Sequence, residues 1–195
     1  MSTPIFCTSY FPSIEYLHCC TQFQQIEIEQ WEQYPKQTVR NRCFILSPNG
    51  VQCLTVPVKH KSGSKTLIKD IKISYDEKWQ QQHWRSLEAA YNRSAFFEFY
   101  KDDLSIVFLK QHEFLIDLND DIFHWMMKKF KHSITIKRTE SFNLNSSFQN
   151  LSNRKNNFLS LTSPKAKPYP QVFTNKFGFV ENLSGLDWLF NTAGN

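Results

Sequence analysis

The sequence of 195 residues lacks the features of a membrane or exported protein. No stretch approaches the ~20 consecutive apolar residues that a membrane-spanning helix requires. The amino terminus has no basic segment followed by an apolar one, so it does not predict a secretory signal. We therefore expect a cytoplasmic protein without a membrane span.

The sequence also lacks the usual metal and nucleotide motifs. Its five cysteines are odd in number and none lies in a C-x-x-C pair, which argues against a disulfide framework and a zinc site. No G-x-G-x-x-G, H-E-x-x-H or G-x-S-x-G motif is present. Gly63-Ser-Lys-Thr resembles the end of a phosphate-binding loop, but Lys59 and Ser64 occupy the two positions that require glycine. The sequence predicts no metal site and leaves any cofactor unknown.

Positive charge is spread along the chain rather than concentrated. The net charge is +5 and the isoelectric point is near 8.9, with acidic residues among the basic clusters. This falls short of the strongly basic face of a nucleic-acid-binding protein, so we expect no nucleic-acid partner. A pocket for an anionic small molecule needs only two or three positive side chains, so a phosphate- or carboxylate-bearing substrate fits the composition.

The chain does contain enough apolar material for one domain with a buried core. Apolar residues make up 41% of it and aromatic residues 15%. Alternation of apolar and polar residues predicts strands, and Pro48-Asn-Gly predicts the turn of a hairpin. The predicted strands are Pro4–Tyr10, Ile26–Trp31, Cys43–Ser47, Val51–Val58, Leu67–Ser74 and Ile134–Ile136.

Helical periodicity dominates the second half of the chain. Ser13 is the predicted N-cap of a short helix, and apolar stripes at helical spacing predict further helices that begin near Trp79, Phe96 and Leu115. Strands first and helices later favour a mixed α/β (α+β) class over regular βαβ winding. We expect a single domain in which a central mixed sheet, including the hairpin, precedes a helical half.

The composition changes near Glu140. We expect residues 1–138 to form the globular core and the Asn- and Ser-rich residues 139–167 to form a flexible insert. Residues 168–195 contain the pattern of a short amphipathic helix, which we expect to dock on the core.

The densest polar cluster connects two predicted strands, at residues 29–43. Side chains at strand ends converge at one rim of a sheet, where binding sites are common. Arginine and asparagine offer forked donors for phosphate or carboxylate, lysine adds charge, and glutamate can act as a base. The candidates are Arg40, Asn41, Arg42, Lys36, Glu29 and Glu32. The alternative is an exposed connection with internal salt bridges.

His83 lies on the apolar face of a predicted helix. The near-neutral pKa of histidine suits general acid or base catalysis if the ring faces a pocket. The alternative is a core histidine with one satisfied hydrogen bond. A nucleophilic pair of Cys43 and His83 is a further interpretation, although Cys43 also fits a strand position.

Five segments of the sequence together resemble a known protein family. They are Tyr10-Phe-Pro-Ser-Ile-Glu-Tyr, Tyr34-Pro-Lys-Gln-Thr-Val-Arg-Asn-Arg-Cys, Leu54-Thr-Val-Pro-Val, Trp79-Gln-Gln-Gln-His-Trp-Arg-Ser-Leu-Glu-Ala-Ala-Tyr and Asn182-Leu-Ser-Gly-Leu-Asp-Trp-Leu-Phe-Asn. In order and spacing they resemble the WbqC-like protein family, in the version found in Bacteroidetes-type bacteria. The resemblance covers nearly the whole chain apart from the Asn- and Ser-rich insert.

Members of that family are encoded in surface-polysaccharide and O-antigen gene clusters. The resemblance therefore implies a bacterial protein that makes or modifies an activated sugar. The chain departs from the family at Ser94-Ala-Phe-Phe, where the family often has Ser-Pro-Phe-Phe. The family's motif residues fall on Tyr10, Glu32, Tyr34, Lys36, Arg40, Asn41, Arg42, His83, Tyr91 and Asp187.

The favoured hypothesis is a group-transfer enzyme that acts on an activated, nucleotide-linked sugar. In it the catalytic residues are His83, Glu32 and Lys36, and the substrate-binding residues are Arg40, Asn41, Arg42, Tyr10, Tyr34, Tyr91 and Asp187. One alternative is a non-catalytic binding or assembly protein of the polysaccharide machinery, with a protein partner held by the C-terminal segment. Another is an acyl transferase or hydrolase that depends on Cys43 and His83.

Overall fold

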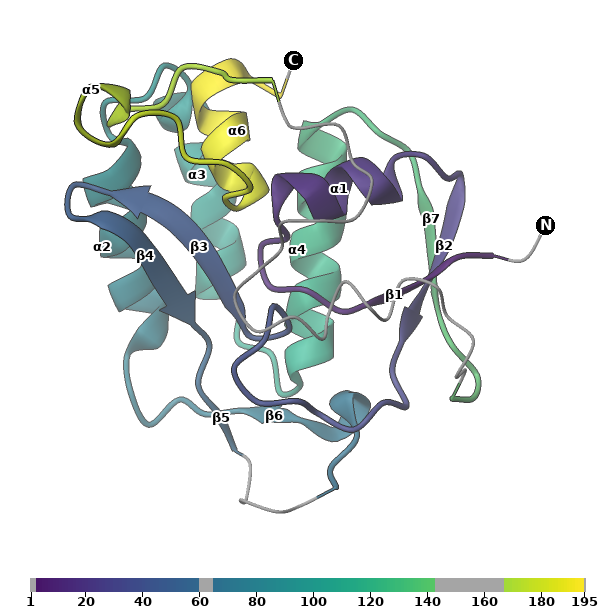
Figure 1. Ribbon diagram of the computed structural model, residues 1–195. Coiled ribbons are helices and arrows are strands. Elements are labelled where there is room, and N and C mark those ends of the chain that lie inside the picture. The colour runs from purple at the N-terminus through teal and green to yellow at the C-terminus, as the bar shows by residue number, and fades with distance from the viewer. Residues whose placement is uncertain (1–2, 60–64, 143–166, 195) are drawn as a thin grey trace.

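Three short parallel strands form the largest sheet of the computed structural model, which describes residues 3–59, 65–142 and 167–194. β1 (Ile5–Cys7) pairs in parallel with β2 (Gln25–Glu29), and α1 (Ile14–Cys20) connects them as a βαβ unit. β7 (Thr135–Arg138) pairs in parallel with the other edge of β2 (Figure 1). The sequence predicted the three strands, but not the βαβ unit at the start of the chain.

The predicted hairpin is confirmed. β3 (Arg42–Ser47) and β4 (Gly50–Thr55) pair antiparallel, and Gly50 closes the turn with a φ of +102°, which glycine adopts readily. β5 (Val58–Lys59) and β6 (Lys72–Ile73) form a further antiparallel pair. The mixed α/β class is also confirmed, but the strands form three small sheets rather than one central sheet, because β3 packs its side chains against helices instead of extending the β1–β2 ladder.

The segment Leu67–Ser74 differs from the single strand that we predicted. It begins with a short 3-10 helix, η1 (Ile68–Asp70), and only then enters β6. Ile68 and Ile71 are both fully buried and lie three residues apart, which is the repeat of a 3-10 helix and not of a strand. The sequence therefore identifies the buried residues correctly, but their spacing of three and then two does not follow the alternation of a single strand.

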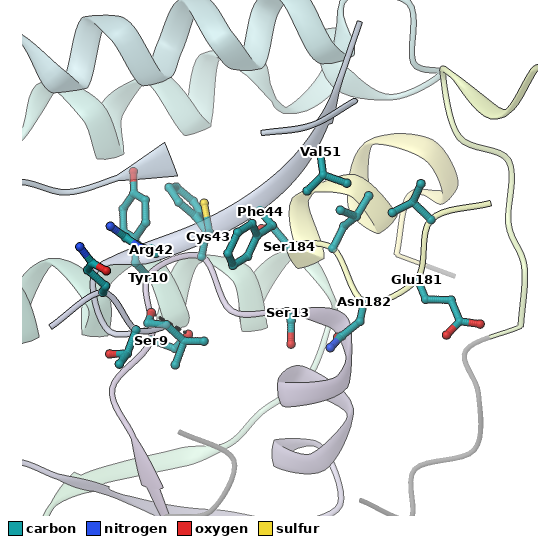
Figure 2. Close-up of a pocket in the computed structure, with 16 residues that line it drawn as sticks. Ser9, Tyr10, Ser13, Arg42, Cys43, Phe44, Val51, Glu181, Asn182 and Ser184 are labelled. Atoms are coloured by element: carbon teal, nitrogen blue, oxygen red, sulfur yellow. Dashed lines mark hydrogen bonds between the residues drawn. The ribbon is translucent and has the colours of Figure 1, made fainter. Parts of the chain in front are cut away.

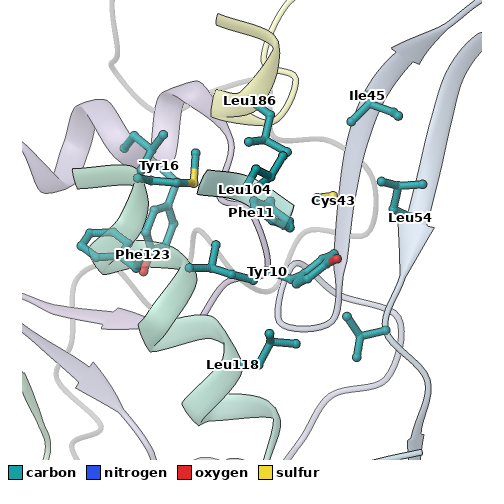
Figure 3. Close-up of a cluster of buried hydrophobic side chains, with 14 of the residues drawn as sticks. Tyr10, Phe11, Tyr16, Cys43, Ile45, Leu54, Leu104, Leu118, Phe123 and Leu186 are labelled. Atoms are coloured by element: carbon teal, nitrogen blue, oxygen red, sulfur yellow. The ribbon is translucent and has the colours of Figure 1, made fainter. Parts of the chain in front are cut away.

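Helices supply most of the core around the hairpin. The predicted helices correspond to α2 (Trp79–Tyr91), α3 (Phe97–Leu109) and α4 (Leu115–Lys129), and the Oγ of Ser13 caps α1 by accepting from the Tyr16 N–H at 3.3 Å. Figure 3 shows side chains of α1, α3, α4, the hairpin and the C-terminal helix meeting in one buried cluster. No helix among the described residues is long and apolar enough to cross a membrane.

The C-terminal segment lies against this core. It contains α5 (Thr174–Phe177) and α6 (Gly185–Thr192), and most of the predicted insert 139–167 lies outside the described residues. The Ser184 N–H donates to the Phe44 carbonyl and the Gly185 N–H donates to the Pro12 carbonyl, both at 2.8 Å. The apolar face of α6 is fully buried. An N-terminal segment around Pro12 and the C-terminal segment around Ser184 therefore meet beside the hairpin.

Gly185 allows this close approach, and its substitution gives a first prediction. A Cβ atom at this position would overlap Leu17 Cδ1 and lie 2.7 Å from Met126 Cε. We expect Gly185→Ala to lower the free energy of unfolding in urea by about 1–3 kcal/mol through overpacking. In a Leu17→Ala background, which removes the overlapping methyl group, the same substitution should cost less; equal costs in both backgrounds would contradict this assignment.

Candidate functional site

A cavity of about 260 Å³ lies between segments from the N-terminal and C-terminal parts of the chain (Figure 2). Its walls come from residues 9–11 after β1, residues 37–39 before β3, residues 42–44 of β3 and residues 180–184 before α6, together with Ser13 and Val51. The loop after the carboxyl end of a parallel strand is a usual ligand site in α/β proteins. The position of the cavity in the fold therefore favours a binding pocket.

Unusual backbone conformations concentrate around this pocket. Phe11, Gln37 and Asn182 have φ values of +37°, +58° and +53°. Only five non-glycine residues in the described parts of the chain have positive φ, and these three line the cavity. Such conformations are costly for side chains larger than glycine and are retained most often at functional sites.

Arg42 is the cation of the pocket. Its Nε is buried without a hydrogen-bond partner, and no carboxylate in the described segments forms an ion pair with it. An arginine always carries its charge and presents forked donors suited to phosphate or carboxylate. Arg42 therefore retains binding capacity for an anion in the cavity.

Arg40 has a different environment from Arg42. Its Nε and Nη2 donate to the two carboxylate oxygens of Glu32 at 2.6 and 2.5 Å, and its side chain is 0% exposed. Its Nη1 lies 3.3 Å from the Thr38 Oγ1. Because neither Arg40 nor Glu32 lines the pocket and each neutralises the other, this geometry favours a structural ion pair over the anion ligand and general base that we predicted.

Tyr10 connects the pocket to His83. Tyr10 is one of the residues that line the cavity, and its phenol oxygen lies 2.8 Å from His83 Nδ1. Burial lowers the pKa of His83 to about 4, although a hydrogen bond to the Thr55 backbone opposes the shift. The ring is therefore neutral at pH 7. Since the neutral ring donates its single N–H to the Thr55 carbonyl, we infer that Nδ1 carries no proton and accepts the hydrogen bond from the Tyr10 hydroxyl.

Four other residues of the predicted polar cluster lie outside the pocket walls. Asn41 donates from Nδ2 to the Val56 carbonyl at 3.0 Å, and Glu29 accepts from the Trp31 N–H at 2.7 Å. Burial raises the pKa of Tyr34 to about 12, against the lowering effect of the nearby arginines. Lys36 is exposed on the connecting loop. Packing and internal hydrogen bonds therefore account for the positions of Asn41, Glu29 and Tyr34.

Tyr91 and Asp187 belong to a second buried polar cluster. The carboxylate of Asp187 accepts from the Tyr169 hydroxyl at 2.7 Å and from Gln171 Nε2 at 2.9 Å. Burial raises the pKa of Asp187, while hydrogen bonds from Tyr169 and Gln171 oppose the shift. Gln171 also exchanges two hydrogen bonds with the Val180 backbone. This cluster therefore positions the pocket wall at residues 180–184 instead of contacting the cavity.

Cys43 lines the pocket without the properties of a nucleophile. Burial raises the pKa of its thiol well above the usual range, which disfavours the thiolate. His83 Nδ1 is committed to Tyr10, so the structure gives no support for a Cys43–His83 pair. Among residues 3–59, 65–142 and 167–194, no group of three or more histidine, cysteine or acidic side chains forms a metal site.

Several pocket residues escaped sequence analysis. Ser9 lies near the end of the predicted strand Pro4–Tyr10 and Ser13 is the predicted helix N-cap, and this strand–loop–helix pattern is a usable signal. Gln37 adjoins the predicted polar cluster, but its positive φ has no signature in the sequence. Part of the wall at residues 180–184 lies in the segment from Asn182 that carries the family resemblance, but no local pattern places it at a pocket, because that depends on where α6 docks.

Comparisons with known proteins assign the chain to a family. The model of the WbqC-like protein family matches residues 8–156, and the chain belongs to that family. "Uncharacterized protein Rv1507c" from Mycobacterium tuberculosis is 33% identical over 113 residues, which cover 57% of this chain and 48% of that protein. The chain thus matches about half the length of that relative. No solved structure matches this chain.

The environment of His83 predicts a pH dependence of stability. The pKa of histidine is 6.5 in the unfolded chain and about 4 at this site, so below pH 6.5 the unfolded chain binds a proton that the folded protein does not. We expect the free energy of unfolding to fall by up to about 3 kcal/mol between pH 6.5 and 4 from this group alone. His83→Gln should remove that part of the slope in urea denaturation, whereas His124→Gln, at an exposed position, should not.

The contrast between the two arginines gives another prediction. Arg40→Met leaves the Glu32 carboxylate, which is 13% exposed, without its partner, and should lower the free energy of unfolding by about 3–5 kcal/mol. Arg42→Met removes no internal partner and should cost less than about 1 kcal/mol. Adding Glu32→Gln to Arg40→Met should restore part of the loss. Equal losses for the two single variants would contradict the division of roles.

Proposed function

We propose that the chain binds a phosphate- or carboxylate-bearing sugar, such as a nucleotide-linked sugar, in this pocket and transfers a group to or from it. The observation that carries the proposal is the unpaired Arg42 at a cavity, two residues from an arginine that is fully neutralised. A buried donor without a partner costs free energy, and a bound anion would satisfy it.

Tyr10 and His83 supply the proton transfer in this proposal. A substrate hydroxyl that donates to the Tyr10 oxygen would lose its proton to Tyr10 as Tyr10 passes its own to His83 Nδ1. His83 is a weak base in the free protein because burial lowers its pKa to about 4. An anion held nearby by Arg42 raises that pKa, so substrate binding would prepare the base.

The sugar substrate and a place in surface-polysaccharide synthesis rest on what the family resemblance implies, while the pocket supports an anionic ligand. The rival function was a binding or assembly protein whose C-terminal helix docks on a partner. Leu186, Leu189 and Phe190 of that helix are each 0% exposed in this chain's own core. The apolar face that a partner would need is therefore already covered, which favours the small-molecule function.

Thermal shift with inorganic phosphate, sugar phosphates and uridine diphosphate sugars tests the proposal. A ligand at about 100 times its dissociation constant stabilises the folded state by about 2.7 kcal/mol. We expect this stabilisation in wild type and in Arg85→Gln, which removes the same charge from an exposed position. Arg42→Gln should abolish it.

His83→Gln separates binding from chemistry. This variant keeps Arg42, so it should retain affinity for the identified ligand and lose turnover. Stabilisation that survives Arg42→Gln unchanged would contradict the pocket as the binding site. Full turnover in a folded His83→Gln protein would remove the proton-transfer role.

A further inference from the structure

One face of the β3–β4 hairpin forms a wall of the pocket that changes from charged to apolar. Side chains two residues apart on a strand share a face, so Arg42 and Phe44 project together, while Cys43 is 4% exposed and faces the core. Val51 pairs with Leu46 across the hairpin and therefore belongs to the same face as Phe44. Along this wall the order is Arg42, Phe44, Val51.

The opposite wall of the pocket also changes from polar near Arg42 to apolar near Val51. Near Arg42 the pocket is closed by polar residues 37–38, and the Tyr10 N–H donates to the Val39 carbonyl at 2.9 Å. Farther along β3, the Ser184 N–H donates to the Phe44 carbonyl, which brings Leu183 and Val180 to the apolar half of the cavity. Figure 2 shows Phe44 between Arg42 and Val51.

Two further observations fix the orientation of a ligand. Val51 lines the pocket yet is 55% exposed, so it presents apolar surface that a ligand would remove from water. Glu181 is an exposed carboxylate at the same end and repels negative charge. An anion is therefore favoured at Arg42, and an uncharged apolar group is favoured beside Val51.

We infer that the pocket binds an amphipathic anion, with a phosphate or carboxylate on Arg42 and a short acyl or alkyl chain between Phe44, Val51 and Leu183. This inference rests on the anion site of the proposed function and adds that the substrate carries a short apolar substituent, which occupies the half of the pocket beside Val51. A cavity of about 260 Å³ suits a short chain rather than a long lipid tail. The two halves of the ligand use different residues, so they can be tested separately.

Isothermal titration calorimetry of the full chain with inorganic phosphate and with ethyl, butyl and hexyl phosphate measures how much the apolar chain of the ligand contributes to affinity. Burying one methylene contributes about 0.8 kcal/mol, so the dissociation constant should fall about fourfold for each added methylene until the chain reaches solvent. The same slope with butanoate and hexanoate would support the inference with carboxylate as the anion.

Variants assign each half of the ligand to its residues. Val51→Ser should flatten the dependence on chain length and leave the affinity for inorganic phosphate unchanged. Ile106→Ser changes a β-branched residue that is 64% exposed on α3, away from the pocket, and should keep the wild-type slope. Arg42→Gln should weaken every phosphate in the series.

The outcomes distinguish this inference from the proposed function. Binding that requires Arg42 but does not depend on chain length would overturn the apolar half and leave the anion site in place. A wild-type slope in Val51→Ser would overturn the assignment of the chain to this wall. If no phosphate, carboxylate or sugar phosphate binds with a dependence on Arg42, both the inference and the proposed function fail.

Discussion

The buried ion pair of Arg40 and Glu32 organises the site. It ties the start and the end of the loop before β3 together, so that loop has a fixed course to the hairpin. The Arg40 carbonyl accepts from Asn119 Nδ2 of α4 at 2.8 Å, and the same amide donates to Thr8 Oγ1 after β1 at 3.0 Å. Three segments that form or support the pocket are thereby joined at one residue, and Arg42, two positions later, is left as the cation that faces the cavity.

Local patterns predicted the elements whose causes are local. The hairpin follows from Pro48-Asn-Gly, and the helices follow from stripes at helical spacing and from the Ser13 cap. The division into three small sheets did not follow, because which strands pair depends on contacts between distant segments. The prediction of one strand at Leu67–Ser74 was wrong because a short run of apolar residues does not by itself distinguish a strand from a 3-10 turn followed by a strand.

The candidate site was predictable by residue type but not by role. Arg40 and Arg42 look equivalent in the sequence, and only the position of Glu32 in the fold separates a structural arginine from one that can bind an anion. The contact of Tyr10 with His83 spans 73 positions, so no spacing rule could supply it. Composition can indicate anion chemistry, whereas tertiary structure decides which cation is free to perform it.

Binding at this pocket cannot be separated from docking of the C-terminal segment. Residues 180–184 form one wall only while the Ser184 and Gly185 amides are bonded to Phe44 and Pro12. Gln171 and the Asp187 carboxylate hold the same wall from its other side. A ligand that contacts both walls has a higher affinity for the protein when the C-terminal segment is docked than when it is undocked. The ligand therefore stabilises the docked state, and the ratio of the two affinities sets by how much. The ion pair at Arg40 and the cluster at Asp187 thus hold opposite walls of one cavity, one from the loop before β3 and the other from the C-terminal segment.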